Sequence, residues 1–206
     1  MYFRKEGKPL NNPSSYRPIT LLPILGKIYE KLILQRIQHF LSNSNLLSGL
    51  QHGFTERRSA ETALESLLSS ITINKQNNYY TSLISIDFTG AFDNLPYSKS
   101  LLSLIKLKLP IQFLNILASF LEDRRAQVDW RNPSVLHYFS RGCPQGSCLG
   151  PFLWSALLET YLSLPHGECC GVIAYADDVM LVVKGASRRD LEQAGNLALS
   201  QISAWS

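Results

Sequence analysis

The feature that most limits the fold of this chain is a pair of carboxylates inside an apolar, strand-forming stretch. Residues 172–183 read Val-Ile-Ala-Tyr-Ala-Asp-Asp-Val-Met-Leu-Val-Val. The apolar runs on both sides predict two strands, and residues 176–178 predict the turn of a hairpin. Ionised groups in apolar surroundings are costly unless a cation compensates them, and a divalent metal is the natural compensator. The alternative is an exposed turn, where paired aspartates are common.

A second strand-like run, residues 79–87, also ends in a carboxylate, Asp87. It is rich in Tyr, Thr and Ile and too short for a helix of usual length, so we expect a buried strand. Three Asp side chains at strand ends suit Mg²⁺, which prefers oxygen ligands and often shares its coordination with substrate phosphates. Two such ions would activate a hydroxyl nucleophile and stabilise a departing pyrophosphate.

The rest of the chain predicts helices interspersed with short strands. We expect helices over residues 23–41, 59–74, 98–108, 111–121 and 151–162, and a last one after Ser187; Ser59 and Ser187 are the expected N-caps. Residues 127–130 and 135–140 predict another hairpin. Because no regular βαβ rhythm is present, we expect an α+β fold with a small, mainly antiparallel sheet packed on helices.

Composition excludes several classes of protein. A chain of 206 residues with 45% hydrophobic residues can bury a core, so it is not a disordered tail. Its longest apolar runs are far below the roughly 20 residues that a membrane-spanning helix needs. The basic N-terminus has no apolar stretch after it, so no secretory signal is expected. We therefore expect an intracellular protein, nuclear or cytoplasmic, with reduced cysteines and no membrane partner.

Charge is distributed unevenly along the chain. Residues 1–58 carry nine Lys or Arg and three Asp or Glu, a net charge of +6, whereas residues 151–206 carry three and six, a net charge of −3. This asymmetry is typical of one part that meets phosphates and another that holds metal. Chance asymmetry on a solvated surface explains the same counts.

Five motifs follow one another along the chain. They are Tyr-Arg-Pro-Ile-Thr-Leu-Leu (16–22), Gln-His-Gly-Phe (51–54), Asp-Phe-Thr-Gly-Ala-Phe-Asp (87–93), Pro-Gln-Gly-Ser-Cys-Leu-Gly-Pro (144–151) and Tyr-Ala-Asp-Asp (175–178). Together they resemble the boxes of reverse transcriptases of non-LTR (LINE-type) retrotransposons, and the last one looks like the metal-binding box of that family. The resemblance covers nearly the whole chain. It implies a right-hand polymerase with fingers in residues 1–78 and a palm with interleaved fingers elements in residues 79–206, the chain stopping before the thumb.

The resemblance also implies a metal site. Asp87, Asp177 and Asp178 would be the catalytic carboxylates and would hold two Mg²⁺ ions, for which Mn²⁺ is a possible substitute. The backbone carbonyl of Phe88 would be a further ligand. Tyr175, in the same box as the paired aspartates, would contact nucleic acid.

Further residues would bind the nucleotide. By resemblance, Arg17 would contact the incoming triphosphate, which suits a guanidinium because it meets phosphate bidentately. Phe92 would be a steric gate that favours deoxynucleotides, although its spacing fits a core aromatic equally well. Gln145 and Gly146 would contact a nucleotide sugar or a template base, and locally they also fit a tight turn.

Two arginines outside these boxes are candidates for nucleic-acid binding. Arg57 and Arg58 precede the helix that Ser59 is expected to cap, where they would contact the template backbone. Solvated surface charge is the alternative for both.

The function that the resemblance implies is RNA-directed DNA polymerisation, with an RNA template, a DNA primer and dNTPs as partners. In-line attack of a primer 3′-hydroxyl needs positioning and charge neutralisation rather than a covalent nucleophile, which agrees with the residues present. The alternative is a degenerate, inactive retroelement fragment that retains at most nucleic-acid binding. An RNA-dependent RNA polymerase shares the paired Asp hairpin, but Phe92 and the Pro-Gln-Gly motif argue against it.

Overall fold

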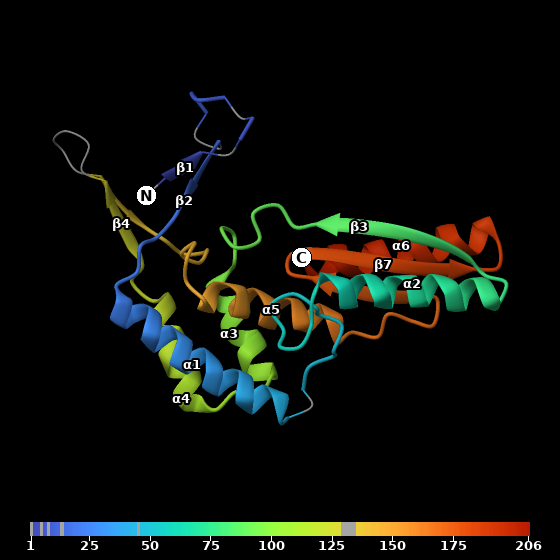
Figure 1. The fold of residues 1–206 in the computed structure, drawn as a ribbon, viewed down its shortest axis with the longest axis horizontal. Helices are drawn as coiled ribbons and strands as arrows, with labels where there is room; N and C mark the ends of the chain where they lie inside the picture. The colour runs from blue at the N-terminus through green and yellow to red at the C-terminus, as the bar shows by residue number, and fades with distance from the viewer. Residues whose placement is uncertain (1, 5, 8, 13–14, 45, 129–134) are drawn as a thin grey trace. The chain divides into compact units, whose positions relative to one another are not determined.

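The computed structural model of the chain describes residues 2–4, 6–7, 9–12, 15–44, 46–128 and 135–206. Helices and small antiparallel sheets are interspersed along the chain, which confirms the α+β class (Figure 1). The chain forms two compact units, each made of two separate stretches. Unit 1 comprises Met1–Ser44 and Gly90–Trp154, and unit 2 comprises Asn45–Thr89 and Ser155–Ser206. Among the described residues, no helix is both long enough and apolar enough to cross a bilayer.

Unit 2 is built on a three-stranded antiparallel sheet. Its strands are β3 (Tyr80–Asp87), β6 (Cys170–Tyr175) and β7 (Asp178–Gly185), in the order β3-β7-β6. The two strands expected around the paired aspartates are thus confirmed as a hairpin, and β3 joins its other side. Central β7 pairs with β3 from Gly185 opposite Tyr80 to Asp178 opposite Asp87.

Residue alternation gives this sheet two different faces. One face is apolar, because Val172 pairs with Leu181 and Ala174 with Val179, and all four side chains are buried. Helix α6 (Arg188–Trp205) and the second half of α5 (Leu149–Leu162) cover this face through residues such as Leu158, Tyr161, Ala198 and Ile202. Helix α2 (Ala60–Gln76) packs on the other face, in front of the sheet in Figure 1, with α6 behind it.

Residues 79–87 form a strand, β3, as expected, but the expectation that this strand is buried was wrong. Along β3, exposed side chains alternate with partly buried ones, and Asp87 at its end is exposed. The physical reason is its place in the sheet, because β3 is an edge strand and only its residues on the apolar face, such as Ile84 and Ile86, pack against the core. Edge strands carry more polar residues than central ones.

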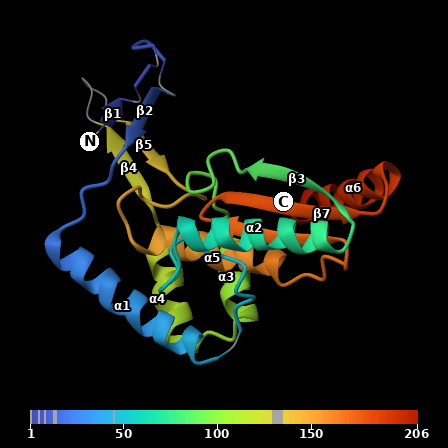
Figure 2. The same ribbon diagram turned by 45° about the vertical axis from the view of Figure 1, so that its right-hand side comes forward.

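Unit 1 contains helices and two small antiparallel hairpins (Figure 2). Its helices are α1 (Ile24–Ser42), α3 (Tyr97–Lys106), α4 (Ile111–Leu121) and the first residues of α5, and α3 packs on α4. Strand β1 (Tyr2–Arg4) pairs with β2 (Tyr16–Pro18), and β4 (Arg125–Val128) pairs with β5 (Val135–Tyr138). The predicted hairpin is therefore confirmed in its strands, while residues 129–134 lie outside the described residues.

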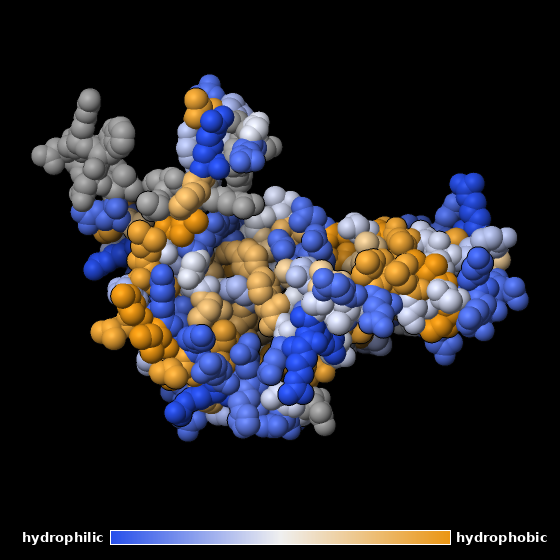
Figure 3. Space-filling view, viewed as in Figure 1, coloured by the Kyte–Doolittle hydropathy of each residue, from blue (hydrophilic) through white to orange (hydrophobic). Residues whose placement is uncertain are grey.

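Helix α1 buries only some of the apolar residues that recur at near-helical spacing in its sequence. Ile24, Leu25, Ile28 and Leu32 are exposed, Leu25 to 79%, whereas Ile37 and Leu41 are buried. Glu30 and Ile33 are also buried. Apolar side chains occur almost all around α1, so periodicity alone does not identify the buried side. Figure 3 shows hydrophobic side chains gathered on the surface over the beginning of α1.

The predicted N-cap of α2 is present in full. The Ser59 hydroxyl accepts from the Thr62 backbone N–H, and the Thr62 hydroxyl accepts from the Ser59 N–H, which makes a reciprocal capping box. We expect Ser59→Ala to lower the free energy of unfolding by about 1 kcal/mol, because one end of this box is lost. Urea denaturation followed by circular dichroism measures the change.

The matched control is Ser69→Ala, in the middle of the same helix. Ser69 is exposed, and alanine has the higher helix propensity there, so its stability should stay equal or rise. Equal losses in the two variants would contradict the capping role of Ser59.

Candidate active site

The register of the three-stranded sheet brings two of the predicted carboxylates together. Asp178, the first residue of β7, is paired directly with Asp87 of β3 and with Tyr175 of β6. Directly opposed residues have Cβ atoms about 5 Å apart and point to the same face. This is the face opposite the apolar core. Asp177 lies beside them in the two-residue turn between Tyr175 and Asp178.

These carboxylates are more exposed than the sequence suggests. Asp87 and Asp178 are exposed and Asp177 is half-buried, which agrees with the exposed turn that the sequence left open as the alternative. In the part of the chain that the structure describes, no group of three or more His, Cys, Asp or Glu side chains is arranged to hold a metal ion. The donor chemistry nevertheless fits Mg²⁺, because two opposed carboxylates and a third one next to them are oxygen ligands.

The turn that carries Asp177 is held by a buried amide from a distant part of unit 2. The Ala176 N–H donates to Gln51 Oε1 at 3.0 Å, and Gln51 Nε2 donates to the Ala176 carbonyl at 3.1 Å. The same Oε1 accepts from the Gly53 N–H at 2.8 Å. Ala176 has a φ of +57°, a left-handed conformation that costs alanine roughly 1 kcal/mol. The amide of Gln51 therefore fixes a turn that its own sequence disfavours.

Backbone contacts bring the same loop against β6. Ala174 donates its N–H to the Leu50 carbonyl at 2.9 Å and accepts from the His52 N–H at 2.8 Å. Gly53 lies so close to the turn that a Cβ atom on it would come within 2.2 Å of the Ala176 nitrogen. Residues 51–53 thus position the carboxylate turn. The sequence alone gave the residues of this Gln-His-Gly-Phe motif no role. Its glycine is the one local sign of a close backbone approach.

The two arginines that follow this loop differ in their contacts. The Arg58 guanidinium donates to the carbonyls of Gly49 and Gln51, so it stabilises the loop. Arg57 is exposed and forms a 3.8 Å ion pair with Glu56, which is also exposed. Contact of either arginine with a template stays a prediction.

Phe88, the residue after β3, anchors the strand end that carries Asp87. Its ring packs edge-on against Trp205 of α6, with the ring centroids 5.8 Å apart. Trp205 in turn packs on Tyr161 and donates its indole N–H to the Thr160 hydroxyl at 2.8 Å. The side chain of Phe88 therefore belongs to the core of unit 2, and its predicted role as a metal ligand concerns the backbone carbonyl alone.

Within unit 1, Gln145 is fixed at both its backbone and its side chain. Its carbonyl accepts from the Thr20 N–H at 2.8 Å, and its Nε2 donates to Asp93 Oδ1 at 2.9 Å. Next to it, Gly146 has a φ of +114°, and a Cβ atom there would meet the Thr20 carbonyl oxygen at 2.8 Å. The turn thus needs glycine at this position. These contacts join three of the motifs, residues 16–22, 87–93 and 144–151.

A buried carboxylate of α1 holds the second half of this turn. Glu30 accepts from the Ser147 hydroxyl at 2.7 Å and from the Cys148 N–H at 3.1 Å. The Ser147 hydroxyl also accepts from the Leu149 N–H at the start of α5. Burial and the nearby Glu30 charge raise the pKa of the Cys148 thiol. Sequence analysis missed both Glu30 and Asp93, whose partners lie 117 and 52 residues away.

The remaining predicted nucleotide-binding residues are also in unit 1. The Phe92 ring is half-buried, and its centroid lies 6.4 Å from that of the Trp154 ring. The backbone carbonyl of Phe92 accepts from the Cys143 N–H. Arg17 lies in β2 opposite Phe3, and its side chain is outside what the structure describes.

The sequence of the chain matches a known protein family. Residues 3–206 match the family described as reverse transcriptase (RNA-dependent DNA polymerase). The chain belongs to the reverse transcriptase family. That the paired aspartates at the β6–β7 turn bind metal, as the resemblance implies, stays a prediction.

Relatives of this reverse transcriptase chain come from retrotransposons, which confirms the resemblance to the non-LTR class. A Drosophila melanogaster protein named "Putative 115 kDa protein in type-1 retrotransposable element R1DM" is 36% identical over 193 residues, covering 94% of this chain and 18% of that protein. The "Probable RNA-directed DNA polymerase from transposon BS" of the same species is 31% identical, covering 100% and 23%. The chain therefore spans about a fifth of the length of these curated relatives.

Solved structures share the reverse transcriptase fold. Apo telomerase from Candida tropicalis superposes with a TM-score of 0.61 at 14% identity, covering 82% of this chain and 33% of that chain. A telomerase from the same species in complex with a fragment of telomeric RNA gives a TM-score of 0.60 at 15% identity, with coverage of 84% and 30%. At such identities the likeness shows the fold alone.

The buried amide of Gln51 gives a first test of how the site is held. We expect Gln51→Ala to lower the free energy of unfolding by about 1–3 kcal/mol, because the N–H groups of Gly53 and Ala176 lose their acceptor. Chemical denaturation measures this loss. Gln193→Ala, at an exposed position of α6, is the control and should leave stability within about 0.5 kcal/mol of the unsubstituted chain. Unchanged stability in Gln51→Ala would refute the bracing role.

The neighbouring His52 gives this region a pH dependence. Burial, together with the nearby Arg58 charge, lowers the pKa of His52 from its ordinary value of 6.5. The unfolded chain then binds a proton more readily than the folded chain, so stability falls as the pH drops below 6.5. Above that value the ring is neutral in both states. Unfolding free energies measured across this range should lose this component in His52→Gln, and identical pH profiles of the two proteins would disprove it.

Proposed function

We propose that this chain is the part of an RNA-directed DNA polymerase that adds deoxynucleotides to a primer 3′-hydroxyl. The observation that carries the proposal is the register of β7, which opposes Asp178 to Asp87 and places Asp177 in the adjoining turn. Membership of the reverse transcriptase family supports the same chemistry. Because the chain spans about a fifth of its curated relatives, the activity is proposed for the catalytic step alone.

In this proposal Asp87, Asp177 and Asp178 hold two divalent ions, Mg²⁺ or Mn²⁺, with the Phe88 carbonyl as a further ligand. Bound there, the ions would favour deprotonation of the primer hydroxyl and neutralise charge on the departing pyrophosphate. The carboxylates supply the negative charge that binds the cations, and the Gln51 amide keeps the turn of Asp177 in one conformation.

The residues of unit 1 would bind the incoming dNTP. Gln145 presents its amide from a turn that is already fixed by Thr20 and Asp93, so little conformational entropy is lost on binding. Phe92 would act as the gate against a 2′-hydroxyl, since its ring is half-buried against Trp154. Arg17 would contact the triphosphate.

The finer architecture belongs to the same proposal. The three-stranded sheet with α6 would be the palm, within residues 79–206, and residues 1–78 would contribute the fingers, as the sequence predicts. An RNA template and a DNA primer are the proposed partners, with Tyr175, Arg57 and Arg58 as candidate contacts. One solved telomerase of this fold is in complex with a fragment of telomeric RNA, which supports an RNA partner. The nuclear or cytoplasmic compartment stays a prediction.

Primer extension tests the proposal directly. With an RNA template, a DNA primer, dNTPs and Mg²⁺, we expect incorporation by the chain and a loss of about a hundredfold or more in Asp177→Asn, because one metal-binding charge is removed. Asp123→Asn is the control, since Asp123 is exposed in a turn at φ +48°, which asparagine adopts easily.

Two outcomes would contradict the proposal. Equal incorporation by the chain and by Asp177→Asn would show that the Asp177 carboxylate is not needed for nucleotide addition. No incorporation by the folded chain would favour the alternative, an inactive retroelement fragment. That alternative is consistent with the described residues, among which no three carboxylates are arranged to hold a metal ion.

A further inference from the structure

An exposed carboxylate of unit 1, Asp93, accepts a hydrogen bond from the side chain of Gln145. The two residues lie 52 positions apart in the chain, and Gln145 Nε2 donates to Asp93 Oδ1 at 2.9 Å. Among the described residues, no lysine or arginine forms an ion pair with Asp93, so no cation competes with the amide for this carboxylate. Substitutions at such exposed positions change folding stability little.

The backbone on both sides of Asp93 is fixed to the segment that leads into the Gln-Gly turn. The Cys143 N–H donates to the Phe92 carbonyl at 2.8 Å. The Gly142 N–H donates to the Leu95 carbonyl at the same distance. A Cβ atom on Gly142 would come within 2.5 Å of the Asp93 carbonyl oxygen, so the two backbones are in close contact. The Asp93 carboxylate therefore projects from a backbone whose position relative to the turn is defined.

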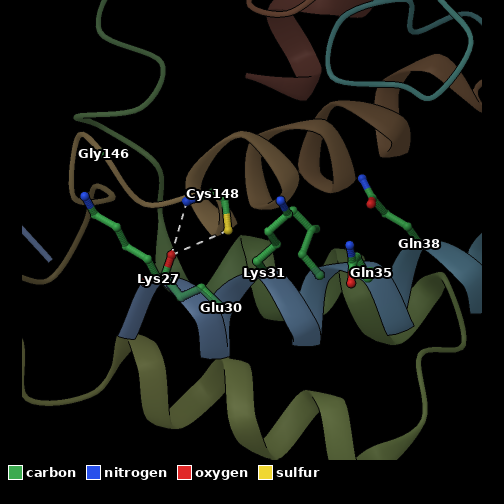
Figure 4. Close-up of a pocket in the computed structure, with 8 residues that line it drawn as sticks. Lys27, Glu30, Lys31, Gln35, Gln38, Gly146 and Cys148 are labelled. Atoms are coloured by element: carbon green, nitrogen blue, oxygen red, sulfur yellow. Dashed lines mark hydrogen bonds between the residues drawn. The ribbon is translucent and has the colours of Figure 1, made fainter. Parts of the chain in front are cut away.

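A different carboxylate holds the rest of the turn. Glu30 of α1 accepts from the Ser147 hydroxyl at 2.7 Å and from the Cys148 N–H at 3.1 Å, and dashed lines in Figure 4 join Glu30 to Cys148. These contacts fix the residues that follow Gln145 and leave its amide untouched. Of the side chains that the structure describes, Asp93 is the one that bonds the amide.

An ionised carboxylate holds an amide in one orientation. It accepts hydrogen bonds and donates none, whereas a glutamine amide has an NH₂ donor at one end and an acceptor oxygen at the other. The NH₂ group of Gln145 must therefore face Asp93. Its Oε1 is the acceptor that is left for a ligand, and no side chain or backbone group of the described residues bonds to it.

We propose that Asp93 is a positioning residue that presents Gln145 Oε1 as a hydrogen-bond acceptor to the incoming nucleotide. The group that binds there would be a donor, such as a sugar hydroxyl, whereas an acceptor such as a phosphate oxygen would be repelled. The inference rests on the proposed function, because it concerns how Gln145 meets its ligand. Without Asp93 the amide would take both orientations, and only the molecules with Oε1 toward the nucleotide would bind it well.

A reversed pair tests this role in the full chain, with the KM for dNTP and kcat measured by primer extension. Gln145→Glu places two carboxylates together, and we expect it to raise KM about tenfold or more, because like charges repel. Adding Asp93→Asn to that variant should lower KM again by about fivefold, because the amide now at position 93 donates to the carboxylate now at position 145. In the unsubstituted chain, Asp93→Asn should instead raise KM about twofold to threefold, because the Gln145 amide then takes both orientations. The value of kcat should change less than KM.

Three controls separate positioning from charge and from stability. Asp93→Ala removes the same charge but supplies no donor, so it should restore the Gln145→Glu variant less than Asp93→Asn does. Asp123→Asn, in an exposed turn of unit 1, should leave KM unchanged in both backgrounds. Urea denaturation should give the same midpoint for the unsubstituted chain and Asp93→Asn, because the bond is exposed.

The sign of the effect decides the matter. Asp93→Asn that raises KM in the unsubstituted chain and lowers it beside Gln145→Glu supports the proposal. A rise in both backgrounds, equal restoration by Asp93→Ala, or urea midpoints that fall in step with the changes in KM would overturn it.

Nuclear magnetic resonance with isotopically labelled glutamine distinguishes failure of this inference from failure of the proposed function. The side-chain NH₂ signal that disappears in Gln145→Glu belongs to Gln145, and Asp93→Asn should shift it, because the acceptor of that group changes. An unmoved signal overturns the role of Asp93, whether or not primers are extended. A shifted signal with no extension by any of the proteins contradicts the proposed function, while Asp93 still orients the amide.

Discussion

Antiparallel pairing on both sides of β7 is the constraint on which the carboxylate site depends. The pairing of Asp178 with Asp87 and Tyr175 is the end of a continuous ladder that starts at Gly185. Strand side chains alternate between faces, so a slip of one residue would send Asp178 to the apolar side and Val179 to the opposite face. The burial of Val179, Leu181 and Val183 against α6 therefore fixes the register, and the register fixes the carboxylates.

The turn at Ala176 and the turn at Gln145 are held in the same physical way, by polar side chains from distant parts of the same unit. The Ala176 turn is bound by Gln51, and the Gln145 turn is bound by Asp93 on one side and by Glu30 on the other side. A turn leaves backbone and side-chain groups without secondary-structure partners, and buried groups of this kind need them. Satisfying them from elsewhere makes each turn rigid before any ligand binds, which limits the entropy lost on binding.

Local signals predicted most of the elements and failed where partners are distant. Capping at Ser59 and the two strands around the paired aspartates depend on neighbouring residues, and the structure confirms them. The burial of β3 depends on sheet order, which places it at an edge, and no property of residues 79–87 reveals that. The same holds for the bracing roles of Gln51, Glu30 and Asp93. The division into two compact units, each made of two stretches, depends on contacts across the chain and is equally invisible to periodicity.

The exposure of Asp87 and Asp178 changes the physical argument for a metal. Exposed carboxylates keep their hydration, so burial no longer requires a compensating cation. The argument now comes from pairing, because like charges directly opposite each other on neighbouring strands are destabilising. A local choice that works against the fold is expected at functional sites, where it is compensated elsewhere. Here the compensation is the apolar face behind the sheet, which fixes the register despite the repulsion, and a divalent cation between the two carboxylates would turn that repulsion into attraction.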